Sequence, residues 1–141
     1  MLRDELVKIA LSWQDKYGVA PAITSAISEY DAAVRILKMS EDQFSDIYKK
    51  QTAVTKGHDF IYRGIRYQVK ANRPSGKKGS PVTLVGKAKN LDWDKLIWIL
   101  YYKNYSIQEA WEWDKLDYER DLFPLKRLSP QHMRKGKNVY S

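Results

Sequence analysis

The segment from Asp59 to Asn72 restricts the fold more than any other part of the chain, because its residues follow a two-residue period. The pattern predicts two strands, Asp59–Tyr62 and Ile65–Asn72. Arg63 and Gly64 lie between them and suit a tight two-residue turn, in which glycine tolerates a positive φ. An antiparallel β-hairpin is therefore expected near the middle of the chain.

Helical periodicity precedes this hairpin. The first expected helix ends at Gly18, which suits a left-handed C-cap, and a second helix begins near Pro21. Ser40 followed by Gln43 is typical of a capping box that opens a short third helix. The first helix carries an apolar stripe at helical spacing, formed by Leu2, Leu6, Ile9, Trp13 and Tyr17.

The chain after the hairpin predicts more sheet and then short helices. Strands are expected at 96–102 and 107–113, followed by a helix over 114–123 and a last helical turn between Ser129 and Gly136. Residues 81–90 fit neither period. We expect one α/β (α+β) domain over 1–141, with a mixed, mainly antiparallel sheet flanked by helices. Its parts are a mostly helical 1–55, a sheet at 56–113 and a helical basic tail at 114–141.

Composition excludes several kinds of site. A chain of 141 residues has the size of one domain, and its 43% hydrophobic and 30% charged residues are ordinary for a globular protein. With no cysteine there is no disulfide, thiolate zinc site or cysteine nucleophile. Two histidines, His58 and His132, argue against a histidine-built metal centre. No apolar run approaches ~18 residues and no signal-peptide pattern is present, so we expect a cytoplasmic protein.

The charge is unusual, at +8 with a pI near 9.5. Residues 60–91 contain no acid, and their basic side chains are Arg63, Arg66, Lys70, Arg73, Lys77, Lys78, Lys87 and Lys89. A second acid-free run contains Lys126, Arg127, Arg134, Lys135 and Lys137. Such basic blocks indicate a polyanion such as nucleic acid, because each neutralised phosphate releases counterions. The alternative is a solvated basic surface that only keeps the protein soluble.

The hairpin register brings polar groups together. With Arg63-Gly64 as the loop, Phe60 faces Tyr67 and Asp59 faces Gln68. Alternate residues Ile65, Tyr67, Val69 and Ala71 point to the core, and Arg66, Gln68, Lys70 and Asn72 point to the other face. Asp59, Gln68 and Lys70 are therefore expected to share one polar face.

These three residue types suit hydrolysis of a phosphodiester. The oxygens of Asp59 and Gln68 are hard ligands for Mg²⁺, with Mn²⁺ as a substitute. Lys70 can orient or deprotonate an attacking water, or stabilise charge on the phosphate. The alternative is an ordinary solvated hairpin face, where such residues are common.

Asp59, followed after eight residues by Gln68-Val69-Lys70, resembles the metal-binding signature of the PD-(D/E)XK nuclease superfamily. Glu29 matches the glutamate on an upstream helix that commonly precedes this signature. The resemblance implies a restriction-endonuclease-like core in which Asp59, the Gln68 side chain and the Val69 carbonyl bind metal. It further implies that Glu29 binds the metal directly or through water and that Lys70 is the catalytic lysine, which makes 56–113 a catalytic sheet.

Two residues depart from the pattern of this superfamily. His58 stands where a proline often precedes the aspartate, and Gln68 replaces the usual acid, which removes one negative charge from the metal site. We expect nucleic-acid contacts from polar and basic residues of the hairpin, the following loop and the tail: Arg66, Asn72, Arg73, Ser75, Lys77, Lys78, Lys87, Lys89, Arg134, Lys135 and Lys137. The tryptophans of the later strands are expected in the core rather than stacked on bases.

The sequence thus predicts a metal-dependent DNA endonuclease. Cutting both strands needs two active sites, so a homodimer is expected, with the N-terminal helices or the Trp-rich strands as candidate interfaces. One alternative is a non-catalytic module that binds DNA or RNA. Another is a subunit that contacts protein through its acidic segment 92–121.

Overall fold

A computed structural model describes residues 1–51, 57–75, 79 and 81–141. Its elements are α1 (Leu2–Tyr17), α2 (Thr24–Tyr30), the π-helix η1 (Asp31–Ile36), α3 (Glu41–Lys50), β1 (Phe60–Tyr62), β2 (Ile65–Asn72), β3 (Lys95–Tyr101), β4 (Ile107–Asp114), α4 (Lys115–Asp121), α5 (Pro130–Met133) and β5 (Lys137–Asn138). None of the helices formed by these residues combines the length and apolarity needed to cross a membrane.

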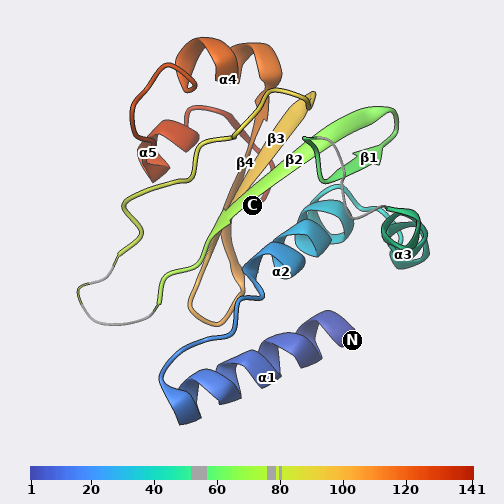
Figure 1. Cartoon of the computed structure of the whole chain (residues 1–141), viewed down its shortest axis with the longest axis vertical. Helices are drawn as coiled ribbons and strands as arrows, with labels where there is room; N and C mark the ends of the chain where they lie inside the picture. Colours follow the sequence, from blue (N-terminus) through green and yellow to red (C-terminus); the bar gives the residue numbers. More distant parts are fainter. Residues whose placement is uncertain (52–56, 76–78, 80) are drawn as a thin grey trace.

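The strands form one five-stranded sheet in the order β1-β2-β3-β4-β5. Only β2 and β3 run parallel, and the other neighbouring strands pair antiparallel. Helix α2 lies along one side of this sheet, whereas α4 and α5 lie on the other (Figure 1). The expected mixed, mainly antiparallel sheet flanked by helices is confirmed. A restriction-endonuclease-like core remains a prediction from the resemblance.

The hairpin has the predicted register, with Phe60 opposite Tyr67 and Tyr62 opposite Ile65. Its two loop residues both have positive φ, 52° at Arg63 and 78° at Gly64, as a two-residue turn between twisted strands requires. One detail differs from the prediction. Strand β1 begins at Phe60, and Asp59 lies in a bend before it, so the expected cross-strand pair between Asp59 and Gln68 is not part of the ladder.

Strand β3 is buried on both faces, which explains its nearly continuous apolar sequence. Ile97 and Ile99 pack with β2, α2 and η1, whereas Leu96 and Trp98 pack with α4 and α5. The expected core position of the tryptophans is confirmed for three of them, because Trp93, Trp98 and Trp113 are at most 4% exposed.

Helix α1 has its expected bounds and its left-handed cap at Gly18, with φ of 83°. The side that it packs against the protein carries Arg3, Val7 and Ala10. Its apolar stripe points to solvent instead, with exposed fractions between 37% and 80% for the side chains of Leu2, Leu6, Ile9, Trp13 and Tyr17. The helix is therefore held by Arg3, Val7 and Ala10, with Leu11 packed partly against the core, and the five stripe residues lie outside it.

The C-terminal tail contains more than the predicted helices. After α5 the chain pairs Asn138 and Lys137 with β4 and so adds β5 at the sheet edge opposite β1. Residues 81–90 contain no helix, and Val85 forms an isolated bridge with Leu128.

The turn from α5 into β5 passes so close to β4 that only glycine fits at position 136. A Cβ there would lie 2.5 Å from Trp113 Nε1 and 2.7 Å from the Glu112 carbonyl oxygen. We expect Gly136→Ala to lower the free energy of unfolding by about 1–3 kcal/mol, measured by urea denaturation. Gly86→Ala is the matched control, because nothing lies within 4 Å of its Cβ. Equal stability of the two variants would contradict this close approach.

Candidate active site

Asp59 is held at the edge of β2 by three hydrogen bonds. Its backbone N–H donates to the Tyr67 carbonyl oxygen at 2.8 Å. Its Oδ2 accepts from the Val69 N–H at 2.7 Å, and its carbonyl oxygen accepts from the Gln51 side-chain amide at 2.5 Å. Burial raises the pKa of the Asp59 carboxyl, against the opposing effects of the Val69 N–H and the charge of Lys70. Asp59 is thus a fixed, partly desolvated carboxyl group beside a lysine.

Glu29 approaches the same place from α2. Tyr48 of α3 donates its hydroxyl hydrogen to Glu29 Oε1 at 2.6 Å. Burial raises the pKa of Glu29 to about 7, and the nearby Asp59 carboxylate adds to the rise. Helices α2 and α3 lie beside the β1–β2 hairpin (Figure 1), and their packing brings the two carboxyl groups within electrostatic reach of each other.

Gln68 and Lys70 lie on β2, with their side chains half-buried. Their parallel partners on β3 are Leu96 and Trp98, so both side chains share the sheet face that α4 and α5 cover. Glu29 comes from α2, which packs on the opposite face. Asp59 lies at the strand edge between the two: the charge of Lys70 lowers the pKa of Asp59, and the charge of Asp59 raises the pKa of Glu29.

Asp59 therefore interacts electrostatically with Glu29 and Lys70 around a strand edge rather than on one face. Gln68, in contrast, is placed by the strand register alone, on the face opposite Glu29. Val69 has its side chain in the core at 7% exposure and contributes only backbone atoms to this edge. The sequence interpretation missed Tyr48 and Gln51, which orient Glu29 and Asp59. Tyr48 follows Phe44 by one helical turn, and the two rings stack with their centroids 4.3 Å apart. The helical spacing in α3 could therefore have predicted that Tyr48 lies on the same side as Phe44.

The donor set fits a hard divalent cation. The described ranges contain no cluster of three His, Cys, Asp or Glu side chains able to hold a metal ion. Two carboxyl groups supply the acidic oxygens here, and the Gln68 amide and the Val69 carbonyl are the neutral oxygens of the predicted set. Mg²⁺ accepts such a set, since it often keeps several waters. The raised pKa values of Glu29 and Asp59 also show an electrostatic cost that a bound cation would relieve.

The pKa of Glu29 predicts a pH dependence of stability. Its folded-state pKa of about 7 exceeds the usual 4.5, so between these values the folded chain binds more protons than the unfolded chain. The free energy of unfolding should fall as the pH rises through this window, by about 1–2 kcal/mol at a carboxyl partly screened by solvent. Glu29→Gln should remove this loss in thermal melts between pH 4 and pH 8. An unchanged pH profile in that variant would contradict the assignment.

Many of the predicted nucleic-acid contacts already have partners within the chain. Arg66 pairs with Asp94 at 3.1 Å, and Arg134 pairs with Glu109 at 2.6 Å. Lys87 donates to the carbonyl oxygens of Phe123 and Leu125, at 2.6 and 2.8 Å, and so fastens the 81–90 segment to the tail.

Arg73 and Asn72 are also engaged. Arg73 donates to the Lys103 carbonyl oxygen at 2.8 Å and to the Gln14 side chain at 2.7 Å. Asn72 accepts from Trp98 Nε1 at 2.9 Å and donates to the Leu84 carbonyl oxygen. The Ser75 carbonyl oxygen accepts from Gln14. The predicted contacts at Lys77 and Lys78 lie outside the described residues.

Lys89 is an exposed lysine of the 88–92 segment. A Cβ on Gly57 would lie 2.7 Å from Asn90 Oδ1 and 2.5 Å from Asp92 Cβ, so the 88–92 segment passes directly beside the chain that leads into Asp59. Lys89 is therefore exposed on a segment that adjoins the stretch of chain leading into Asp59.

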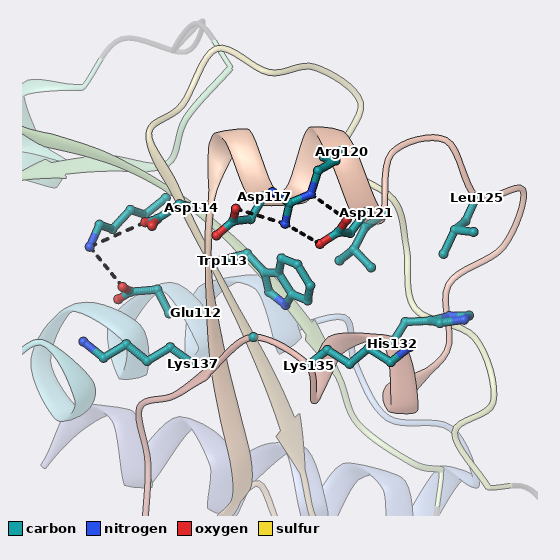
Figure 2. Close-up of a pocket in the computed structure, with 13 residues that line it drawn as sticks. Glu112, Trp113, Asp114, Asp117, Arg120, Asp121, Leu125, His132, Lys135 and Lys137 are labelled. Carbon is teal, nitrogen blue, oxygen red and sulfur yellow. Dashed lines mark hydrogen bonds and ion pairs between the residues drawn. The ribbon is translucent and has the colours of Figure 1, made fainter.

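Lys135 and Lys137 line a separate pocket at the far end of the sheet order (Figure 2). The acids of that pocket have local partners. Arg120 pairs with Asp117 and Asp121, at 3.3 and 2.8 Å, and Lys95 pairs with Glu112 and Asp114. Strand β5 and strand β1 are opposite edges of the sheet, so these lysines and the Asp59 edge form two separate sites.

Comparison of the chain with known protein families and with curated proteins finds no match. The assignment of a reaction therefore depends on the geometry of the Asp59 edge and on the resemblance of the Asp59 and Gln68-Val69-Lys70 signature. The geometry supplies two carboxyl groups, of which Asp59 raises the pKa of Glu29, and a lysine whose charge acts on Asp59.

Proposed function

We propose that this protein is a metal-dependent DNA endonuclease whose active site is the Asp59 edge of β2. One observation carries the proposal: a half-buried carboxyl group, Asp59, is within electrostatic reach of a second carboxyl, Glu29, and of an ammonium group, Lys70. A carboxyl group that raises the pKa of another carboxyl and lies within reach of a lysine is characteristic of sites that handle phosphate and protons.

Each residue of this edge has a chemical role in the proposal. Asp59 and Glu29, with the Gln68 amide and the Val69 carbonyl, would hold Mg²⁺. When bound, the ion would polarise the phosphoryl oxygen and acidify a water molecule. Lys70 Nζ would donate to that water or to a non-bridging phosphate oxygen, and so place positive charge where negative charge develops. Tyr48 would keep Glu29 Oε1 oriented through its 2.6 Å hydrogen bond.

The surface charge supports a DNA substrate. The chain carries +8, and the exposed Lys89 lies on the 88–92 segment that passes beside Gly57, from where it could contact the backbone of a bound strand. Arginines that are paired within the chain, such as Arg66, can still contact DNA, because an exposed ion pair is weak enough to be replaced by a contact to phosphate. A homodimer would supply the two sites that a double-strand cut requires.

A second candidate function is a nucleic-acid-binding module without catalysis. It is favoured by Gln68, an amide in place of the usual acid, and by Glu29, whose pKa of about 7 keeps it partly protonated at neutral pH. Both reduce the negative charge available to a metal ion. Salt-dependent DNA binding is common to the two functions, so only cleavage separates them.

The experiment is incubation of purified protein with supercoiled DNA in Mg²⁺ or Mn²⁺. We expect nicked circles that disappear when EDTA is added. Asp59→Asn should abolish nicking, and Asp42→Asn, which changes an exposed carboxyl on α3, should leave it intact. Nicking that persists at the wild-type rate in Asp59→Asn, or in EDTA, would exclude this active site.

A further inference from the structure

The apolar stripe of α1 is the largest run of exposed apolar side chains on one element of the described chain. Its members occupy one side of the helix over its full length of 16 residues. Ile9 is 64% exposed and Trp13 52% exposed, and the rings of Trp13 and Tyr17 lie 4.7 Å apart. Contiguous exposed apolar surface of this kind marks an interaction site.

Helix α1 is also well fastened to the protein beneath it. The buried Arg3 donates to Asp31 of η1 at 2.8 and 3.0 Å and to the Tyr105 carbonyl oxygen at 2.6 Å. Val7 and Ala10 are buried below the same helix. The stripe is therefore presented outward by a helix whose orientation is fixed from the other side.

An acidic and a basic residue lie on the same side of the stripe, at opposite ends of α1. Glu5 lies in the first turns and Lys16 in the last turn, and at 100° per residue both fall on the same flank of the stripe. A shallow groove follows this flank, lined by Glu5, Lys8, Ile9, Ser12, Trp13, Lys16 and Tyr17. One flank thus carries opposite charges at its two ends.

We propose that α1 pairs antiparallel with α1 of a second copy of this chain. Ile9 would lie near the two-fold axis, Leu2 would face Tyr17 of the second copy, and Leu6 would face Trp13 of the second copy. A two-fold axis perpendicular to both helices brings each flank against the same flank of the other copy. Glu5 would then lie near Lys16 of the second copy, with an axial offset of about 3 Å.

The charges on α1 favour a second copy of α1 as the partner and favour antiparallel pairing. Antiparallel pairing joins acid to base at both ends and opposes the two helix dipoles, whereas parallel pairing would align the dipoles and put Glu5 and Lys16 of the two copies on opposite sides of the pair. The helix carries equal numbers of acidic and basic side chains, namely Asp4, Glu5 and Asp15 with Arg3, Lys8 and Lys16. It therefore lacks the basic excess that attracts helices to anionic membranes. The inference is independent of the nuclease proposal, because no residue of the Asp59 edge contributes to it.

The test is the mass of the full chain by sedimentation equilibrium across protein concentration. We expect reversible dimers of twice the 16.5 kDa chain mass. Trp13→Glu and Ile9→Glu should each raise the dimer dissociation constant at least about 100-fold. Leu116→Glu is the matched control, since Leu116 is an exposed leucine on α4 and should leave the dimer unchanged. Circular dichroism verifies that each variant is folded.

A charge swap tests the direction of pairing. Glu5→Lys and Lys16→Glu should each weaken the dimer about 3- to 10-fold, and the double variant should regain most of the lost affinity. A chain that is monomeric at all concentrations would overturn the proposal, as would a dimer that Trp13→Glu does not weaken. A monomer that instead binds anionic vesicles through α1 would assign the stripe to a membrane and also overturn it.

Discussion

Replacing Lys70 by alanine should lower the rate of DNA cleavage at least about 100-fold, which is the usual cost of losing one charge-stabilising donor at a reacting phosphate. Lys70 is a half-buried strand residue whose charge lowers the pKa of Asp59, so its ammonium group is within electrostatic reach of that carboxyl. Single-turnover cleavage of a labelled duplex in excess Mg²⁺ measures the effect directly. Binding of the same duplex in Ca²⁺, followed by fluorescence anisotropy, should change less than about threefold.

A lysine elsewhere controls for loss of net charge. Lys103 is exposed in the turn between β3 and β4, and Lys103→Ala should keep both cleavage and binding near wild type. Parallel loss of binding and cleavage in Lys70→Ala would make this residue a DNA contact rather than part of the catalytic machinery. Full cleavage by Lys70→Ala would remove it from the site.

The largest expected effect on stability belongs to the ion pair under α1. Asp31 is 0% exposed and accepts from Arg3 and from the Tyr101 hydroxyl, the latter at 2.7 Å. Asp31→Ala leaves a buried guanidinium without its partner, so the free energy of unfolding should fall by about 3–5 kcal/mol. Guanidinium denaturation followed by tryptophan fluorescence measures the difference.

Two further variants separate this ion pair from a general effect of charge removal. Asp121→Ala breaks an exposed pair with Arg120 and should cost less than about 1 kcal/mol. Arg3→Met combined with Asp31→Leu should be more stable than Asp31→Ala alone, because no buried charge is then left unpaired. If Asp31→Ala cost no more than Asp121→Ala, the buried pair would not be what holds α1.

Local patterns predicted the elements of this fold well. The turn at Arg63-Gly64 and the two strands beside it depend on alternation and on the φ that glycine tolerates, both of which act within a few residues. The side chain of Ser40 accepts from the Gln43 N–H at 3.1 Å, as the expected N-terminus of α3 requires. These features could be predicted from the sequence because neighbouring residues alone determine them.

Features that depend on distant partners were harder to predict. The apolar stripe of α1 predicts an amphipathic helix, but the spacing of its residues does not determine which surface the helix packs against. In the structure Val7 and Ala10 are buried in the core, and the stripe is not. Strand β5 was missed because two residues, Lys137 and Asn138, are too short for a period to be recognised.

The candidate site shows the same division. Strand alternation correctly separated Val69 from Gln68 and Lys70, but the bend at Asp59 moved its carboxyl to the strand edge and onto the Val69 N–H. The excess of basic residues is evident in the sequence. Their intramolecular partners, such as Asp94 for Arg66, are not, because those pairs form only once β2 lies beside β3.

Direct measurement of metal binding tests the central claim, that Asp59 and Glu29 form a cation site next to Lys70. Electron paramagnetic resonance of free Mn²⁺ during titration into the protein should show one site per chain, with affinity falling below pH 7 as Glu29 binds its proton. Asp59→Asn should lose that site, and Asp42→Asn should keep it. Absence of bound Mn²⁺ in the folded wild-type chain, or equal binding by Asp59→Asn, would contradict the account.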